Sequence, residues 1–168
     1  TLTISGSQAD INATLATLSY QGNLNFNGTE TLTVVSTDSG GTPLSDTDAV
    51  TINVGAVNDA PVNTVVSPLA ATEDVALPIN SISVNDVDGN LASTQLTVGN
   101  GNLNVTLVGG ASISAGTNGS PTLTISGSQA DINATLATLS YQGNLNFNGT
   151  ETLTVVSTDS GGTPLSDT

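Results

Sequence analysis

Apolar and polar residues alternate in short runs along most of this chain. The clearest runs are bounded by Gly, Asn, Asp or Pro and cover residues 31–36, 49–54, 81–84, 95–98, 103–108 and 122–126. A period of two predicts half-buried strands, and the bounding residues predict the turns between them. We therefore expect an all-β chain of short strands.

One interval departs from this alternation. Ser128 opens a Ser-Gln-Ala-Asp sequence, after which Ile132, Leu136 and Leu139 follow at spacings of four and three. These spacings place the apolar residues on one face of a helix, and the Ser-x-x-acid pattern is typical of a helix start. We predict a short helix here and another at residues 7–17, each covering one end of a β-structure and crossing between its sheets. A partner-binding helix is the alternative.

The chain contains a verbatim internal repeat. Residues 1–47 recur without change as residues 122–168, which gives a period of 121 residues. Identical tandem copies are typical of spacers, stalks and multivalent surfaces, whose output grows with copy number. About seven strands and one short helix per period fit one immunoglobulin-like β-sandwich.

The repeat boundary is expected near Pro61, because a strand run ends there and proline interrupts strand pairing. Residues 1–58 are then the C-terminal part of one repeat, residues 59–61 are the junction, and residues 60–168 are the next repeat without its last strand. That missing strand corresponds to residues 48–58. We hypothesise that another copy of residues 49–54, from the array or from a neighbouring chain, fills the vacant position.

The charge of the chain is entirely of one sign. It has 14 acidic residues and no Lys, Arg, His or Cys, so its formal charge is −14. Side-chain salt bridges and disulfides are therefore impossible, nucleic acid is disfavoured as a partner, and cations are expected to bind. No run approaches the roughly 20 apolar residues of a membrane span, so we expect no membrane insertion in this fragment.

The same composition argues against an enzyme. Without His, Cys or Lys, the chain cannot form the usual Ser-His-acid or Cys-His nucleophile, or a lysine Schiff base. A pair of carboxylates could still act as in a glycosidase, but the acids lie in repeated turns and linkers. We expect no catalytic residues.

Two acids form the clearest candidate for metal binding. Asp86 and Asp88 are two positions apart in a loop that ends at Gly89, so both carboxylates could be directed at one calcium ion. A simple polar turn is the alternative. Because no positive side chain is present to offset converging carboxylates, the composition favours the cation site.

Several motifs resemble a known family. Residues 36–45, then 48–54 and 57–61, resemble the end of a cadherin repeat and its linker, while Glu73-Asp74 and residues 86–89 resemble acidic elements of the following repeat. The 25–30 segment and the Val-Asn-Asp-Ala-Pro-Val run are most similar to bacterial cadherin-like repeats of giant surface adhesins, including RTX-type adhesins. The resemblance covers the whole repeat and implies tandem cadherin-like, immunoglobulin-like β-sandwiches.

The resemblance also implies calcium at the junctions between repeats. The junction near residue 59 would use Asn58, Asp59, Asp86, Asp88 and Asp159. Glu73 would serve the following junction and Asp38 the preceding one. No counterpart of the cadherin Asp-Arg-Glu element is present, so one or two ions per junction are expected.

The function implied is that of a structural extender in a secreted or cell-surface adhesin, stiffened by calcium and located outside the cell or on a bacterial surface. Its partners would be neighbouring copies of the repeat and, by strand exchange, other chains. Two alternatives remain open. One is a self-assembling extracellular filament or surface-layer subunit joined by strand exchange. The other is a carbohydrate-binding module. A flat ladder of Thr side chains or an exposed aromatic platform would distinguish this alternative.

Overall fold

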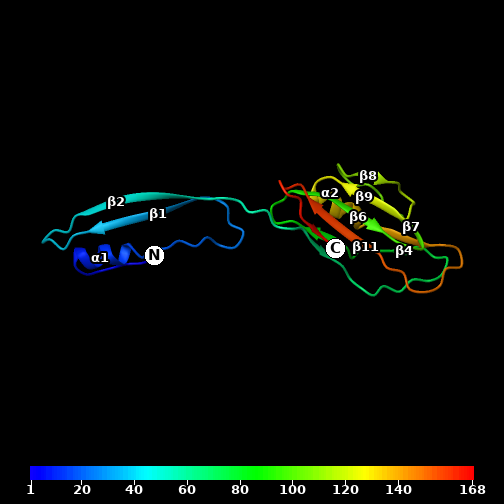
Figure 1. Cartoon of the computed structure of the whole chain (residues 1–168), viewed down its shortest axis with the longest axis horizontal. Coiled ribbons are helices and arrows are strands. Elements are labelled where there is room, and N and C mark those ends of the chain that lie inside the picture. Colours follow the sequence, from blue (N-terminus) through cyan, green and yellow to red (C-terminus); the bar gives the residue numbers. More distant parts are fainter. The chain divides into compact units, whose positions relative to one another are not determined.

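The computed structural model describes residues 1–168 and divides the chain into two units, Thr1–Val57 and Asn58–Thr168. Both consist mainly of strands, and each contains one short helix (Figure 1). The expected all-β class is confirmed. No helix has the length and apolar character needed to cross a membrane.

The second unit holds most of the strands. In chain order its elements are β3 (Val62–Thr64), β4 (Leu77–Pro78), β5 (Ser83–Asn85), β6 (Leu91–Thr97), β7 (Gly101–Asn104), β8 (Ser112–Gly116), β9 (Thr122–Ser126), α2 (Gln129–Leu136), β10 (Ser140–Gly143), β11 (Thr154–Asp159) and β12 (Ser166–Asp167). A five-stranded sheet has the order β12-β11-β6-β9-β8, and a three-stranded sheet has the order β4-β10-β7. The remaining pair is β3-β5, and every pairing is antiparallel.

One apolar core joins these elements. The five-stranded sheet contributes Leu96 and Leu123, the three-stranded sheet contributes Leu103, and α2 contributes Ile132 and Leu136, all of them fully buried. Burial alternates along β9, as a period of two requires when one face of a strand meets the core. The predicted apolar face of the helix at 129–136 is therefore the face that packs inward.

The first unit has α1 (Gln8–Leu15) and a hairpin of β1 (Gly28–Thr37) and β2 (Ser45–Val54). The two strands pair antiparallel over ten positions, from Gly28 opposite Val54 to Thr37 opposite Ser45. No residue of this unit is buried. A two-stranded hairpin without a buried face is marginally stable in water. The first unit is therefore held mainly by the main-chain hydrogen bonds between β1 and β2.

The repeated sequence shows which elements are locally determined. The helix forms in both copies, and both begin with the same cap: Ser7 Oγ accepts from Asp10 N, and Ser128 Oγ accepts from Asp131 N. By contrast, residues 122–126 form β9 between two neighbours, whereas the identical residues 1–5 form no strand. Helix formation is local here, and strand formation requires a partner.

The predicted run at 103–108 is only partly a strand, since β7 ends at Asn104. Beyond that point side chains replace a neighbouring strand: Val105 N donates to Asn118 Oδ1 (2.8 Å), and Thr106 N donates to Thr138 Oγ1 (2.8 Å). Strands β3, β4, β8, β10 and β12 were not among the predicted runs, because they are short or carry little alternation.

The duplicated helix provides a matched test of the core. We expect Leu136→Ala to lower the free energy of unfolding of the second unit by about 2–5 kcal/mol, because a fully buried leucine leaves a cavity. Leu15→Ala changes the same residue in the same helical sequence, but its side chain is 38% exposed, so the transition of the second unit should not move. Urea unfolding followed by circular dichroism measures both, and equal effects would contradict the assignment of the core.

Candidate cation site at the start of the second unit

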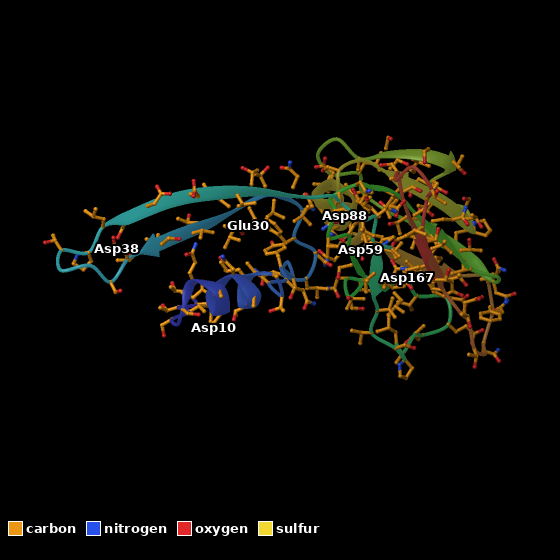
Figure 2. All side chains as sticks on the ribbon, turned by 60° about the vertical axis from the view of Figure 1, so that its left-hand side comes forward. Asp10, Glu30, Asp38, Asp59, Asp88 and Asp167 are labelled. Carbon is orange, nitrogen blue, oxygen red and sulfur yellow. The ribbon has the colours of Figure 1, made fainter.

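Five of the predicted ligands lie together at the start of the second unit. Asp59 N donates to Asp88 Oδ2 (2.7 Å), and Asp88 N donates to Asp86 Oδ1 (2.9 Å). Asn58 Nδ2 donates to Asp159 Oδ2 (2.8 Å). Figure 2 shows Asp59 and Asp88 side by side. The residues before β3 are thereby joined to the β5–β6 turn and to the end of β11.

Asp159 is positioned by the loop that follows it. Its Oδ1 accepts from Gly161 N and Leu165 N, both at 3.0 Å, so the carboxylate holds the turn between β11 and β12. A side chain at Gly161 would collide with the Asn58 amide, which explains the glycine at this position. Asp159 is only 2% exposed. Its burial alone would raise the pKa, but the hydrogen bonds from Leu165, Asn58 and Gly161 hold that pKa below the ordinary carboxyl value.

Asn90 completes a row of four polar side chains, which we call the polar network: Asp86, Asn90, Asn58 and Asp159. Asn90 Nδ2 donates to Asn58 Oδ1 (2.7 Å), and Asn58 Nδ2 donates to Asp159. At the other end Asn90 Oδ1 lies 2.9 Å from Asp86 Oδ2 and 3.2 Å from Asp86 Oδ1. An amide oxygen and an ionised carboxylate oxygen are both acceptors, so this contact is not a hydrogen bond.

No rotation of the amides removes this conflict. Turning Asn90 over lets its Nδ2 donate to Asp86, but its oxygen then faces Asn58 Oδ1 at 2.7 Å. Turning Asn58 over as well leaves its oxygen facing Asp159. Each amide has one donor end and one acceptor end, whereas an ionised carboxylate only accepts. A row with a carboxylate at both ends therefore always keeps one contact between two oxygens.

Such a contact is stabilised either by a proton on one carboxyl group or by a cation. At neutral pH the cation is the better match, because calcium binds several carboxylate, amide and main-chain oxygens at once. No group of three or more His, Cys, Asp or Glu residues forms a metal-binding cluster in the described chain. An ion at the polar network would thus combine carboxylates with asparagine and main-chain oxygens.

Asn90 was not among the predicted ligands. It lies two positions after Asp88 in the run Asp-Val-Asp-Gly-Asn, and an amide just beyond an acidic turn was the available signal. The two other predicted ligands lie elsewhere. Asp38 belongs to the first unit, where it accepts from Gly40 N (3.2 Å) and Leu44 N (3.1 Å) of its own loop. Glu73 lies between β3 and β4 and lines a cavity.

The lowered pKa of Asp159 gives a pH prediction. An ionised Asp159 stabilises the second unit above about pH 4, and this contribution is lost as the pH falls through the lowered pKa. We expect Asp159→Asn to lower stability at neutral pH and to flatten the acid decline of the unfolding free energy, measured by urea titrations at a series of pH values. Asp38→Asn, in the identical loop of the first unit, should leave the profile of the second unit unchanged. An equally steep acid decline in Asp159→Asn would show that this carboxylate is not responsible.

In comparisons with known proteins, no protein-family model, no curated protein and no solved structure matches the chain.

Proposed function

We propose that this chain is part of an array of β-sandwich repeats that serves as an extender in a secreted or cell-surface adhesin, with calcium stiffening the junctions between repeats. The observation that carries the proposal is the polar network, in which an oxygen-to-oxygen contact persists whichever way the amides are turned. One of its members, Asn58, is the residue at which the second unit begins.

The sandwich is supported by the shared core. Leu96 and Leu123 of the five-stranded sheet and Leu103 and Tyr141 of the three-stranded sheet belong to a single cluster of buried residues. Two sheets whose inner side chains meet in one core are the defining arrangement of a sandwich. The verbatim sequence repeat supports the array.

The mechanical role follows from where the network lies in the sequence. Asn58 and Asp59 come directly after Val57, the last residue of the first unit, and both are bonded to loops of the second unit. A cation at the network would draw the oxygens of Asp86, Asn90 and Asn58 together in place of the repulsive contact. The segment between repeats would then be held to two loops, which restricts its rotation and lets the array transmit force.

The charge of the chain strengthens the argument for calcium. With 14 acidic residues and no basic ones, a long array carries a large uncompensated negative charge. Bound divalent ions reduce that repulsion, and extracellular modules bind calcium with dissociation constants of about 10⁻⁴–10⁻³ M. A secreted array would therefore bind its ions only after leaving the cell.

Replacing one carboxylate by an amide provides the decisive variant. In Asp86→Asn the new amide nitrogen can donate to Asn90 Oδ1, so every link of the polar network is satisfied without a cation. We expect this variant to be at least as stable as the native chain in chelator, and to gain no stability from calcium. The native chain should melt at a higher temperature in calcium than in chelator, by mass action on the folded state.

The control is Asp46→Asn, which makes the same charge change at an exposed residue of β2. It should keep the full calcium response, measured by differential scanning calorimetry. If the native melting temperature does not respond to calcium, the cation part of the proposal is wrong. If the melting temperature rises but small-angle scattering dimensions stay the same, calcium binds without stiffening the array.

A further inference from the structure

Four Asn-Gly pairs occur in the chain, at residues 27–28, 100–101, 118–119 and 148–149. In such a pair the main-chain nitrogen of the glycine can attack the side-chain carbonyl carbon of the asparagine. Glycine favours this attack because it has no side chain to block the approach and permits the main-chain rotation that ring closure requires. The reaction therefore depends on how firmly the amide and the main chain are held, and the structure holds the four pairs differently.

The pair Asn118-Gly119 is held at three points. Asn118 Oδ1 accepts from Val105 N (2.8 Å), and Asn118 Nδ2 donates to Val105 O (3.0 Å). Gly119 N donates to Leu103 O (2.9 Å). Because Val105 is only 6% exposed, rotation of the Asn118 amide would leave two buried main-chain groups without partners. Both reacting groups of this pair are occupied.

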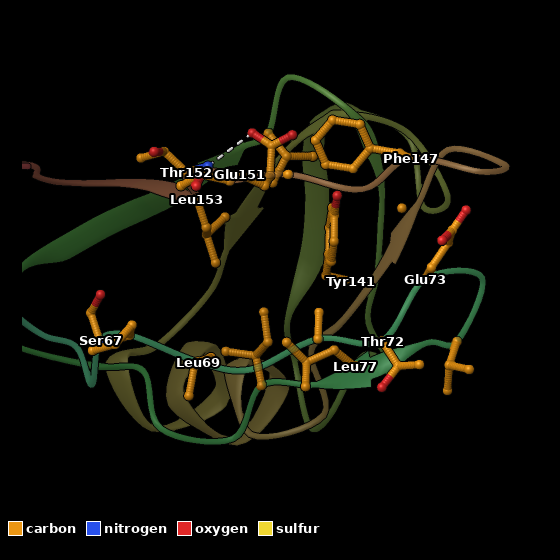
Figure 3. Close-up of a pocket in the computed structure, with 18 of the residues that line it drawn as sticks. Ser67, Leu69, Thr72, Glu73, Leu77, Tyr141, Phe147, Glu151, Thr152 and Leu153 are labelled. Atoms are coloured by element: carbon orange, nitrogen blue, oxygen red, sulfur yellow. Dashed lines mark hydrogen bonds between the residues drawn. The ribbon is translucent and has the colours of Figure 1, made fainter.

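The pair Asn100-Gly101 is held through its main chain. Asn100 N donates to the Glu151 carboxylate, which also accepts from Thr152 N (2.9 Å), as Figure 3 shows for the second bond. On the other side of the same residue, Asn100 O accepts from the Tyr141 hydroxyl group. A side chain at Gly101 would collide with the Tyr141 ring, so this turn is closely packed. These contacts oppose the rotation that ring closure needs.

The other two pairs follow an identical turn in the two copies of the repeat. Within residues 23–26, Phe26 N donates to the carbonyl oxygen of the first residue (3.0 Å), and within residues 144–147 Phe147 N does the same (2.9 Å). The third residue of each turn is an asparagine in the left-handed conformation, with φ of 59° and 60°. The turn therefore forms from local sequence in both copies.

Asn27 and Asn148 come directly after this turn, and both side chains are exposed. Asn27 precedes β1, which is paired with β2, whereas Asn148 precedes a segment that belongs to no strand. The exposure of this asparagine is thus the same in two different surroundings, with and without an adjacent strand. It follows from the local turn and not from what lies beside it.

We propose that Asn27 and Asn148 are sites of spontaneous deamidation, and that the fold protects Asn118 and Asn100 from the same reaction. The glycine nitrogen loses its proton and forms a bond to asparagine Cγ, while the bond from Cγ to the side-chain nitrogen breaks. That nitrogen takes up the proton and leaves as ammonia. Water then opens the resulting five-membered succinimide at either carbonyl carbon, which gives aspartate or isoaspartate. Water is the only co-reactant, and nothing is oxidised or reduced.

The product differs from the native chain in charge and in main-chain path. Each event replaces a neutral amide by a carboxylate, which adds one negative charge to a chain of formal charge −14 that has no basic side chain to offset it. Isoaspartate also adds a methylene group to the main chain. At Asn27 that group lies directly before Gly28, the first residue of β1. Older molecules would therefore be distinguished from new ones at a fixed position in each repeat.

The test is to incubate the full chain in mildly alkaline buffer, digest it with pepsin at acid pH and locate the modified residues by tandem mass spectrometry. The two copies give identical peptides, so Asn27→Gln and Asn148→Gln variants identify which copy has reacted. Glutamine serves this purpose because it would have to close a six-membered ring. We expect deamidation at both asparagines, with isoaspartate among the products. Asn25 and Asn146, each followed by phenylalanine, should stay unmodified and provide an internal control.

Unfolding the chain in urea separates the effect of sequence from that of structure. All four Asn-Gly pairs should react at similar rates in urea, whereas Asn118 should react at least about tenfold more slowly in the folded chain, because it must first open locally. Lack of reaction at either Asn27 or Asn148 in the folded chain would overturn the proposal. An Asn118 that reacts as fast in the folded chain as in urea would also overturn it. No step involves a cation, so failure here leaves the proposed function standing.

Discussion

The lack of any basic side chain is the constraint on which the rest of this structure depends. Each buried or half-buried carboxylate must accept from a main-chain N–H, an amide or a hydroxyl group, because no salt bridge is possible. Asp159 holds its loop through Gly161 and Leu165, Glu151 accepts from Gly99 N (3.0 Å), and Asp167 accepts from Asn63 N (2.6 Å). The acids thereby shape the loops in addition to carrying charge. In the polar network, however, two carboxylates compete for two amides and one link lacks a donor.

The repeated sequence separates what is local from what is not. The capped helix could be predicted because Ser128 and Asp131 satisfy its first turn wherever the sequence occurs. Strands β9 and β10 form only where neighbours exist, since the identical residues near the N-terminus remain irregular. A pattern of alternating residues indicates that a segment can become a strand, but the partner decides whether it does. Short pairs such as β4 and β10 leave almost no pattern to detect.

The candidate site was predictable in part for the same reason. Asp86 and Asp88 share one turn, so their proximity follows from sequence spacing alone. The approach of Asn58 to Asp159, 101 positions away, depends on the fold and was expected only from the resemblance. Asn90 was missed because an asparagine in a turn is ordinary. Its importance comes from its place between two other side chains.

We propose that a cation takes the place of the contact between two oxygens in the polar network. The most direct measurement is a calcium titration followed by nuclear magnetic resonance of the side-chain amides and carboxyl carbons. We expect saturable shifts of Asn58, Asn90, Asp86 and Asp159, while Asp38, in the identical loop of the first unit, stays unchanged. Small, unsaturated shifts spread over all the acidic residues would instead show general screening of charge and would contradict a specific site.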